Sequence, residues 1–106
     1  MALSVTSSRT LQYGIRFLYE ANNQPVRGAA VGIASRTGNG WSAITWMATD
    51  GRGYATFPIP GRGQYRLTTT IRGRRQDGVV DVQYSYQTNR LWVRSDGTLR
   101  VERFVP

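Results

Sequence analysis

The sequence predicts an all-β protein, a single β-sandwich of seven to eight mostly antiparallel strands. Apolar and polar residues alternate with a period of two along most of the chain, and no segment keeps the helical period. Turn signals recur about every 8–12 residues, which is typical of a sandwich or a small barrel. The chain has 106 residues, the length of one domain, so residues 1–106 are assigned to it, with 1–8 as a flexible start.

Three strands are predicted in the first half of the chain. On the first strand, alternate apolar residues share one face: Leu11, Tyr13, Ile15, Phe17 and Tyr19. Val31 and Ile33 point inward on the second strand, after a turn at 20–24. The third strand covers 41–48. Because side chains alternate along a strand, Trp41 and Trp46 are predicted on opposite faces of it, one of them in the core.

The second half of the chain adds the remaining strands. A turn at 49–53 leads into a short extended segment at 54–57, and the two prolines and two glycines of 58–63 indicate a loop. The next strand has alternating inward residues: Tyr65, Leu67, Thr69 and Ile71. Residues 73–78 are predicted as a polar turn. One face of the strand after it is formed by Val80, Val82, Tyr84 and Tyr86, so both tyrosines are predicted in the core. Strands at 90–94 and 98–105 end the chain.

The last two strands allow a register argument. A two-residue loop, Asp96-Gly97, would place Val93 opposite Arg100. A three-residue loop at 95–97 places Val93 opposite Leu99 and gathers the apolar residues on one face. Such loops favour a left-handed residue at their third position, where Gly97 stands, so the three-residue loop is predicted.

Three segments carry a family resemblance. Residues 25–31 read P-V-R-G-A-A-V, residues 49–57 read T-D-G-R-G-Y-A-T-F, and residues 63–68 read G-Q-Y-R-L-T. In this order they resemble the bacterial Ig-like domains of the invasin and intimin type, and almost as closely the carboxypeptidase regulatory-like modules. The resemblance implies an Ig-like or prealbumin-like sandwich, usually non-catalytic, in a bacterial surface, secreted or virion-associated protein.

The charged residues restrict the chemistry. All 14 basic residues are arginine, against six carboxylates, and the chain has neither histidine nor cysteine. Without His, Cys or Lys there is no ordinary nucleophile–base pair, so the chain is predicted not to be an enzyme. Hard metal ions need clustered carboxylates, and the six carboxylates of this chain are scattered, so no metal site is predicted. No cofactor is expected. The arginine-only set has two open explanations, codon usage in a GC-rich genome or selection for bidentate contacts to anions.

Two groups of residues are candidates for binding. The first is the turn arginines Arg72, Arg74 and Arg75, which lie around Gly73 and could contact a phosphate or sulfate. The second is the outward face of the last hairpin. In the predicted register this face presents Arg90, Trp92 and Arg94 with Arg100 beside them, a flat aromatic ring flanked by cations. In both groups the alternative is structural: solvated turn arginines, and ordinary cross-strand pairs.

The leading functional hypothesis is a non-catalytic interaction or structural module with a protein or glycan partner. The alternative is an arginine-rich binder of anionic polymers, either nucleic acid or acidic polysaccharide, since a charge of +8 attracts polyanions. No signal peptide and no membrane-spanning segment is recognised, although the resemblance favours a secreted or cell-surface protein. A monomer or a weak dimer is expected.

Overall fold

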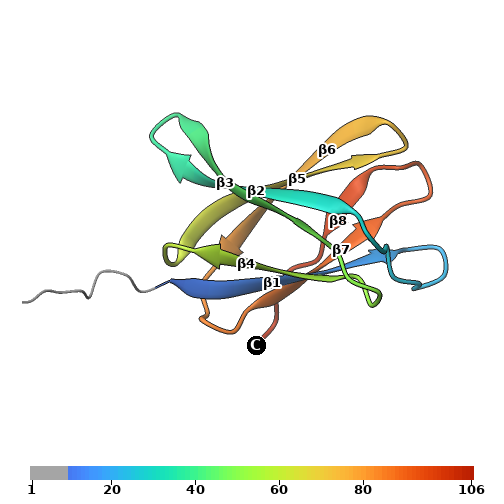
Figure 1. Ribbon diagram of the computed structural model, residues 1–106, viewed down its shortest axis with the longest axis horizontal. Helices are drawn as coiled ribbons and strands as arrows, with labels where there is room; N and C mark the ends of the chain where they lie inside the picture. Colours follow the sequence, from blue (N-terminus) through green and yellow to red (C-terminus); the bar gives the residue numbers. More distant parts are fainter. Residues whose placement is uncertain (1–9) are drawn as a thin grey trace, which may run out of the picture.

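The computed structural model describes residues 10–106, which form eight strands and no helix (Figure 1). The strands are β1 (Leu11–Tyr19), β2 (Ala30–Thr37), β3 (Gly40–Ala48), β4 (Tyr54–Ile59), β5 (Gly63–Ile71), β6 (Arg74–Val82), β7 (Thr88–Val93) and β8 (Leu99–Val101). The flexible start predicted for residues 1–8 lies outside the described residues. Within the described residues, no helix is present that is long and apolar enough to cross a membrane.

The strands form two four-stranded sheets. The first sheet has the order β4-β1-β7-β8 and the second has the order β3-β2-β5-β6. β1 and β7 run parallel, and every other pair of neighbouring strands is antiparallel. The predicted fold class is therefore confirmed: an all-β sandwich of eight mostly antiparallel strands.

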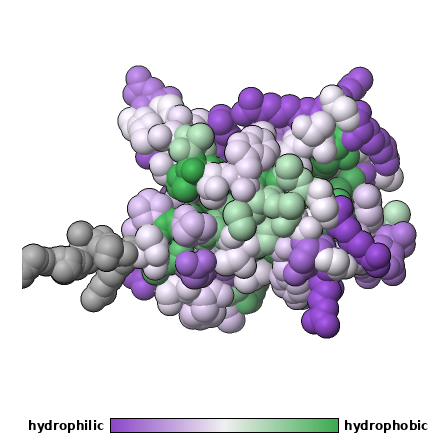
Figure 2. Space-filling model, in the orientation of Figure 1, coloured by the Kyte–Doolittle hydropathy of each residue, from purple (hydrophilic) through white to green (hydrophobic). Residues whose placement is uncertain are grey.

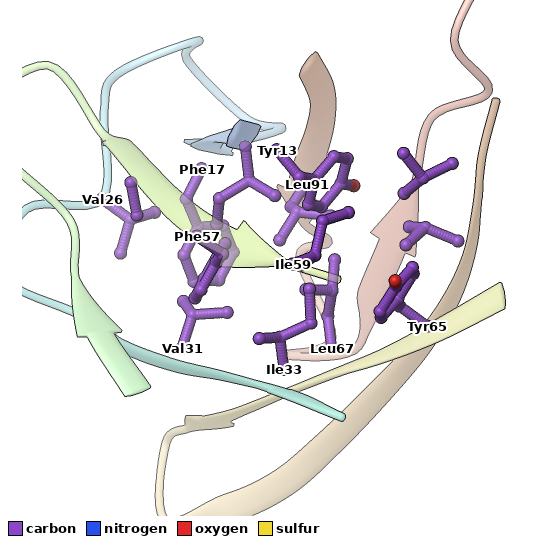
Figure 3. Packing of buried hydrophobic residues seen from close by; sticks show 14 of the residues in the cluster. Tyr13, Phe17, Val26, Val31, Ile33, Phe57, Ile59, Tyr65, Leu67 and Leu91 are labelled. Carbon is purple, nitrogen blue, oxygen red and sulfur yellow. The ribbon is translucent and has the colours of Figure 1, made fainter. Parts of the chain in front are cut away.

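The core lies between the two sheets, as Figure 3 shows. Alternate residues of each strand point into it, so the period-two pattern becomes one apolar layer. Tyr13, Ile15 and Phe17 of β1 meet Leu67 of β5, and each is at most 1% exposed. The predicted inward faces of these two strands are confirmed, except that Tyr19 is exposed at the end of β1.

Two sequence predictions about β6 are wrong. The strand begins at Arg74, so most of the predicted 73–78 turn is strand, and the chain reverses at Arg72 and Gly73 in a tight turn with φ of 53° and 78°. The strand also ends at Val82. Tyr84 and Tyr86 follow it in a turn, are 38% and 65% exposed, and contact Phe104 instead of the core.

A β-bulge overturns the prediction for the two tryptophans of β3. In the pairing of β2 with β3, Ile33 pairs with Thr45 but Ala34 pairs with Ala43, so Ile44 is the additional residue. The bulge shifts the alternation by one position. As a result, Trp41 lies opposite Arg36 and Trp46 lies opposite Gly32. Both tryptophans are on the same outer face, and neither belongs to the core.

The predicted register of the last hairpin is confirmed. Val93 pairs with Leu99, Trp92 with Arg100 and Leu91 with Val101. The loop has three residues, 95–97, and Gly97 closes it with a φ of 86°. The Gly97 N–H donates to the Arg94 carbonyl at 2.9 Å. This register places Arg90 of β7 next to Glu102, which follows β8.

Candidate functional site

The outer face of the first sheet carries a row of four polar side chains. Tyr54 of β4 pairs with Arg16 of β1, and Arg16 pairs with Arg90 of β7. The row continues past the end of β8, because the Glu102 N–H donates to the Arg90 carbonyl at 2.9 Å. Residues far apart in the sequence thus become neighbours: one aromatic ring, two guanidinium groups and one carboxylate.

Between this row and the C-terminal segment lies a groove of about 330 Å³, called here the arginine groove. It is lined by Arg16, Tyr54, Thr88, Arg90, Glu102, Arg103, Phe104 and Val105. It combines guanidinium donors, two hydroxyl groups, a carboxylate acceptor and two aromatic rings. Such a surface can hold a small ligand that is both planar and polar.

Arg16 is held in place at the centre of the row. Its guanidinium carbon lies 4.9 Å from the centre of the Tyr54 ring, a cation–π contact. Its Nε donates to the Arg52 carbonyl at 3.2 Å. These two contacts use one face and one N–H of the guanidinium, and its other N–H groups make no hydrogen bond to residues 10–106.

Glu102 is tied to β7 by two side chains. It accepts hydrogen bonds from Arg90 Nη1 at 3.3 Å and from Trp92 Nε1 at 2.9 Å. Arg100 lies over the Trp92 ring at 5.4 Å, and its Nε bonds Glu20 at 2.8 Å. Exposed ion pairs of this kind stabilise a fold by only about 0–1 kcal/mol, so their main effect here is to orient the side chains.

A buried polar network supports the groove from inside the sandwich. The Tyr13 hydroxyl and Gln87 Nε2 both donate to Asn89 Oδ1, at 2.9 and 2.8 Å. Asn89 Nδ2 donates to the Glu102 carbonyl at 2.8 Å and so anchors the C-terminal segment. Burial raises the pKa of Tyr13 far above its ordinary value, which keeps its hydroxyl protonated as a donor.

The structure separates the two predicted groups. Arg90, Trp92 and Arg100 lie together on the outer face of the first sheet as predicted, and Arg94 is exposed just after β7. None of the turn arginines lines the arginine groove. The contacts of that group are as follows: Arg72 Nη1 donates to the Ser95 carbonyl at 2.9 Å, Arg75 pairs with Asp77, and Arg74 is exposed at the start of β6.

Among the residues that line the groove, Arg90 was a predicted candidate, whereas Arg16, Tyr54 and Thr88 were not. The alternation of β1 does place Arg16 on its outward face, but no local pattern indicates that β1 and β7 pair in parallel. The burial of Asn89 could have been predicted from the sequence. Asn89 stands two positions before the inward-facing Leu91 on the same strand, so its side chain should also point into the sandwich.

Comparison with known proteins finds similarity at the level of structure. No protein-family model and no curated protein matches the chain. A sea bream transthyretin solved in complex with thyroxine is 19% identical, with a TM-score of 0.68, covering 88% of this chain and 93% of that one. A 5-hydroxyisourate hydrolase from Klebsiella pneumoniae is 18% identical, with a TM-score of 0.65 and coverage of 88% and 97%. An (S)-allantoin synthase is 13% identical, with a TM-score of 0.64, covering 92% of this chain and 45% of the synthase.

At these identities the similarity establishes the fold alone: a transthyretin-like, or prealbumin-like, β-sandwich. The coarse expectation of a sandwich is confirmed, whereas the invasin, intimin and carboxypeptidase regulatory-like assignments are not supported. The expected role as a surface, secreted or virion-associated module is contradicted, because these neighbours are named as enzymes or were solved with a small ligand. A protein or glycan partner likewise finds no support in them.

Proposed function

We propose that the chain binds a small, planar, anionic heterocycle in the arginine groove. The observation that carries this proposal is the row formed by Tyr54, Arg16, Arg90 and Glu102 across the first sheet. Guanidinium groups donate to carbonyl and anionic oxygens, the carboxylate accepts from ring N–H groups, and an aromatic ring contacts a planar face. A heterocycle that carries all three features uses the whole row.

The charge of the face favours an anion. Four arginines contribute to it, namely Arg16, Arg90, Arg100 and Arg103, against the carboxylates of Glu20 and Glu102. The surplus of two positive charges supports binding of a negatively charged ligand. The neighbours give independent support for the size of the ligand, since thyroxine and 5-hydroxyisourate are both small organic molecules.

Binding, rather than turnover, is the proposed activity. The chain has no histidine, cysteine or lysine, and the lining of the groove offers arginine, tyrosine, threonine and glutamate side chains. These residues orient and neutralise an anion more readily than they form a covalent intermediate. The sequence-based prediction that the chain is not an enzyme therefore stays a prediction, and a turnover assay checks it directly.

Calorimetric titration with urate, a planar heterocyclic anion, tests the proposal. We expect saturable 1:1 binding, weakened about tenfold or more in Arg90→Gln and in Arg16→Gln, because each variant removes charge-assisted donors. Arg62→Gln is the matched control, since it removes one charge from an exposed loop outside the groove. Equal affinity in all three variants would overturn the assignment of the groove.

A second measurement addresses catalysis. The chain is incubated with 5-hydroxyisourate, the compound named for the Klebsiella neighbour, and its decay is compared with that in buffer. We expect the same decay rate with and without the protein. A faster decay that is lost in Arg90→Gln would replace the binding proposal with a catalytic one at the same groove.

A further inference from the structure

The second sheet has a groove of its own on the opposite side of the sandwich. Its volume is about 320 Å³, and its lining includes Gly32, Ala34, Ala43, Trp46, Arg66 and Thr68. We call it the tryptophan groove. Hydrophilic side chains lie along the upper edge of Figure 2, where β2, β3, β5 and β6 are placed in Figure 1. None of its lining residues belongs to the arginine groove.

The pairing of the strands explains the shape of this groove. Trp46, Gly32, Thr68 and Asp77 form one row across β3, β2, β5 and β6. In the next row, Ala34 pairs with Arg66. Small residues of β2 therefore form the floor, with a large aromatic side chain on one side and polar side chains on the other.

Trp46 lies flat on this floor. A Cβ atom at Gly32 would be only 2.8–2.9 Å from three atoms of the indole, so the ring occupies the space that the missing side chain leaves open. Trp46 is nevertheless 59% exposed. One face of the indole is thus supported by the sheet and the other is open to solvent, an arrangement that suits stacking of a second ring.

Arg66, which lines the same groove, supplies an unsatisfied donor. Its guanidinium carbon lies 5.5 Å from the centre of the Trp41 ring, which fixes its position along β5. Its Nε is buried and has no hydrogen-bond partner within residues 10–106. Leaving a buried donor without an acceptor costs about 1–3 kcal/mol, so a turn of the guanidinium that brought Nε to an anion in the groove would relieve an existing cost.

The neighbouring carboxylate does not neutralise Arg66 by direct contact. Asp77 accepts hydrogen bonds from Thr68 Oγ1 at 2.8 Å and from Arg75 Nε at 3.1 Å. Partial burial raises the pKa of Asp77, but the two hydrogen bonds together with the charges of Arg75 and Arg66 leave the pKa below its ordinary value. Asp77 is therefore ionised and paired with Arg75. It attracts Arg66 through space but makes no hydrogen bond to it within residues 10–106, so the N–H groups of Arg66 can still donate to a ligand.

We propose that the tryptophan groove binds an aromatic carboxylate, with its ring stacked on the open face of Trp46 and its carboxylate on the guanidinium of Arg66. A ring without charge would leave Arg66 unsatisfied, and an anion without a ring would leave the Trp46 face exposed. The proposal does not depend on the arginine groove, because the two grooves belong to different sheets.

Titration with 2-naphthoate tests this proposal by NMR. The indole N–H signals of Trp41, Trp46 and Trp92 are assigned with single Trp→Phe variants. We expect 2-naphthoate to shift the Trp46 signal with saturation and to leave the Trp92 signal unchanged. Urate should not displace it, which separates this groove from the one on the first sheet.

Three variants test the two halves of the site. Arg66→Gln should weaken binding about tenfold or more, because it removes the charged donor. Trp46→Ala should weaken it about threefold to tenfold by removing the stacking surface. Gly32→Ala keeps every proposed contact group but displaces the indole, so it should also weaken binding. Its melting temperature shows whether the fold is intact, and Arg62→Gln again controls for net charge.

The proposal fails under three results. Binding of 2-naphthoate that shifts only Trp92 would place the ligand on the first sheet. Equal binding of uncharged 2-naphthalenemethanol would eliminate the role of Arg66. Equal binding of glucuronate, a carboxylate without an aromatic ring, would eliminate stacking on Trp46.

Discussion

Gly53 offers the sharpest test of how the fold supports the arginine groove. It ends the turn between β3 and β4 with a φ of 83°, a left-handed conformation that residues with a Cβ rarely adopt. A Cβ atom there would collide with the carbonyl oxygen of Phe17 and come within 3.2 Å of the Pro25 Cβ. Gly53→Ala therefore combines backbone strain with a steric clash against β1.

The expected cost can be worked out from two contributions. Placing alanine in the left-handed region costs about 1–2 kcal/mol. The clash also displaces the hydrogen bond from the Phe17 N–H to the Gly53 carbonyl, which is 2.7 Å long, and this loss adds about 0.5–1.5 kcal/mol. Gly53→Ala should thus lower the free energy of unfolding by about 1.5–3.5 kcal/mol. The same turn holds the Arg52 carbonyl that orients Arg16, so urate binding should weaken as well.

Urea unfolding measures the effect, with Gly51→Ala as the matched control. Gly51 lies in the same turn, is not among the glycines with positive φ, and has no atom within 4 Å of a Cβ built on it. Its variant should unfold at nearly the same urea concentration as the unmodified chain. If the two variants differ by less than about 0.5 kcal/mol at equal m-values, the argument from strain and clash is refuted.

Three further predictions concern the core and the ionisable groups. Leu67 is 0% exposed, so Leu67→Ala should lower the free energy of unfolding by about 2–5 kcal/mol in urea. Burial raises the pKa of Tyr13 in the folded state, so stability should fall as pH rises above about 10, where the unfolded chain loses this proton; Tyr13→Phe should flatten that slope. Hydrogen bonds from the backbone N–H groups of Tyr54 and Arg52 lower the pKa of Asp50. Ionised Asp50 should therefore stabilise the folded state above about pH 4, and this stabilisation should be lost as pH falls below that value. In Asp50→Asn the melting temperature should depend less on pH in the acid range.

The sequence predicts this fold well where one face of a strand is apolar. β5 alternates strictly and β1 alternates as far as Phe17, after which Leu18 is also buried. The last hairpin could be assigned to its register because only one loop length gathers its apolar residues. Alternation alone fails beyond the end of a strand. Tyr84 and Tyr86 continue the pattern of Val80 and Val82, yet the chain leaves the sheet after Val82 and both rings become exposed.

The binding surfaces are harder to predict, for two physical reasons. A bulge moves every following side chain to the other face, and a single additional residue at Ile44 is not visible as an interruption of the pattern. The arginine groove depends on the parallel pairing of β1 with β7, strands about 70 residues apart, so no local spacing connects Arg16 with Arg90. Arg90 and Trp92 were predictable because they lie on one hairpin.

The outer faces of the two sheets share one device, the stacking of arginine on an aromatic ring. Arg16 lies over Tyr54, Arg100 over Trp92, and both Arg36 and Arg66 over Trp41, with centroid distances of 4.9–5.5 Å. A guanidinium group is planar, is weakly hydrated and keeps N–H donors free while it stacks, whereas an ammonium group does not offer this geometry. At these four positions lysine would preserve the charge but lose the planar stacking. Whichever cause set the number of arginines, at these positions on both sheets the side chain makes a contact that depends on its planar guanidinium group.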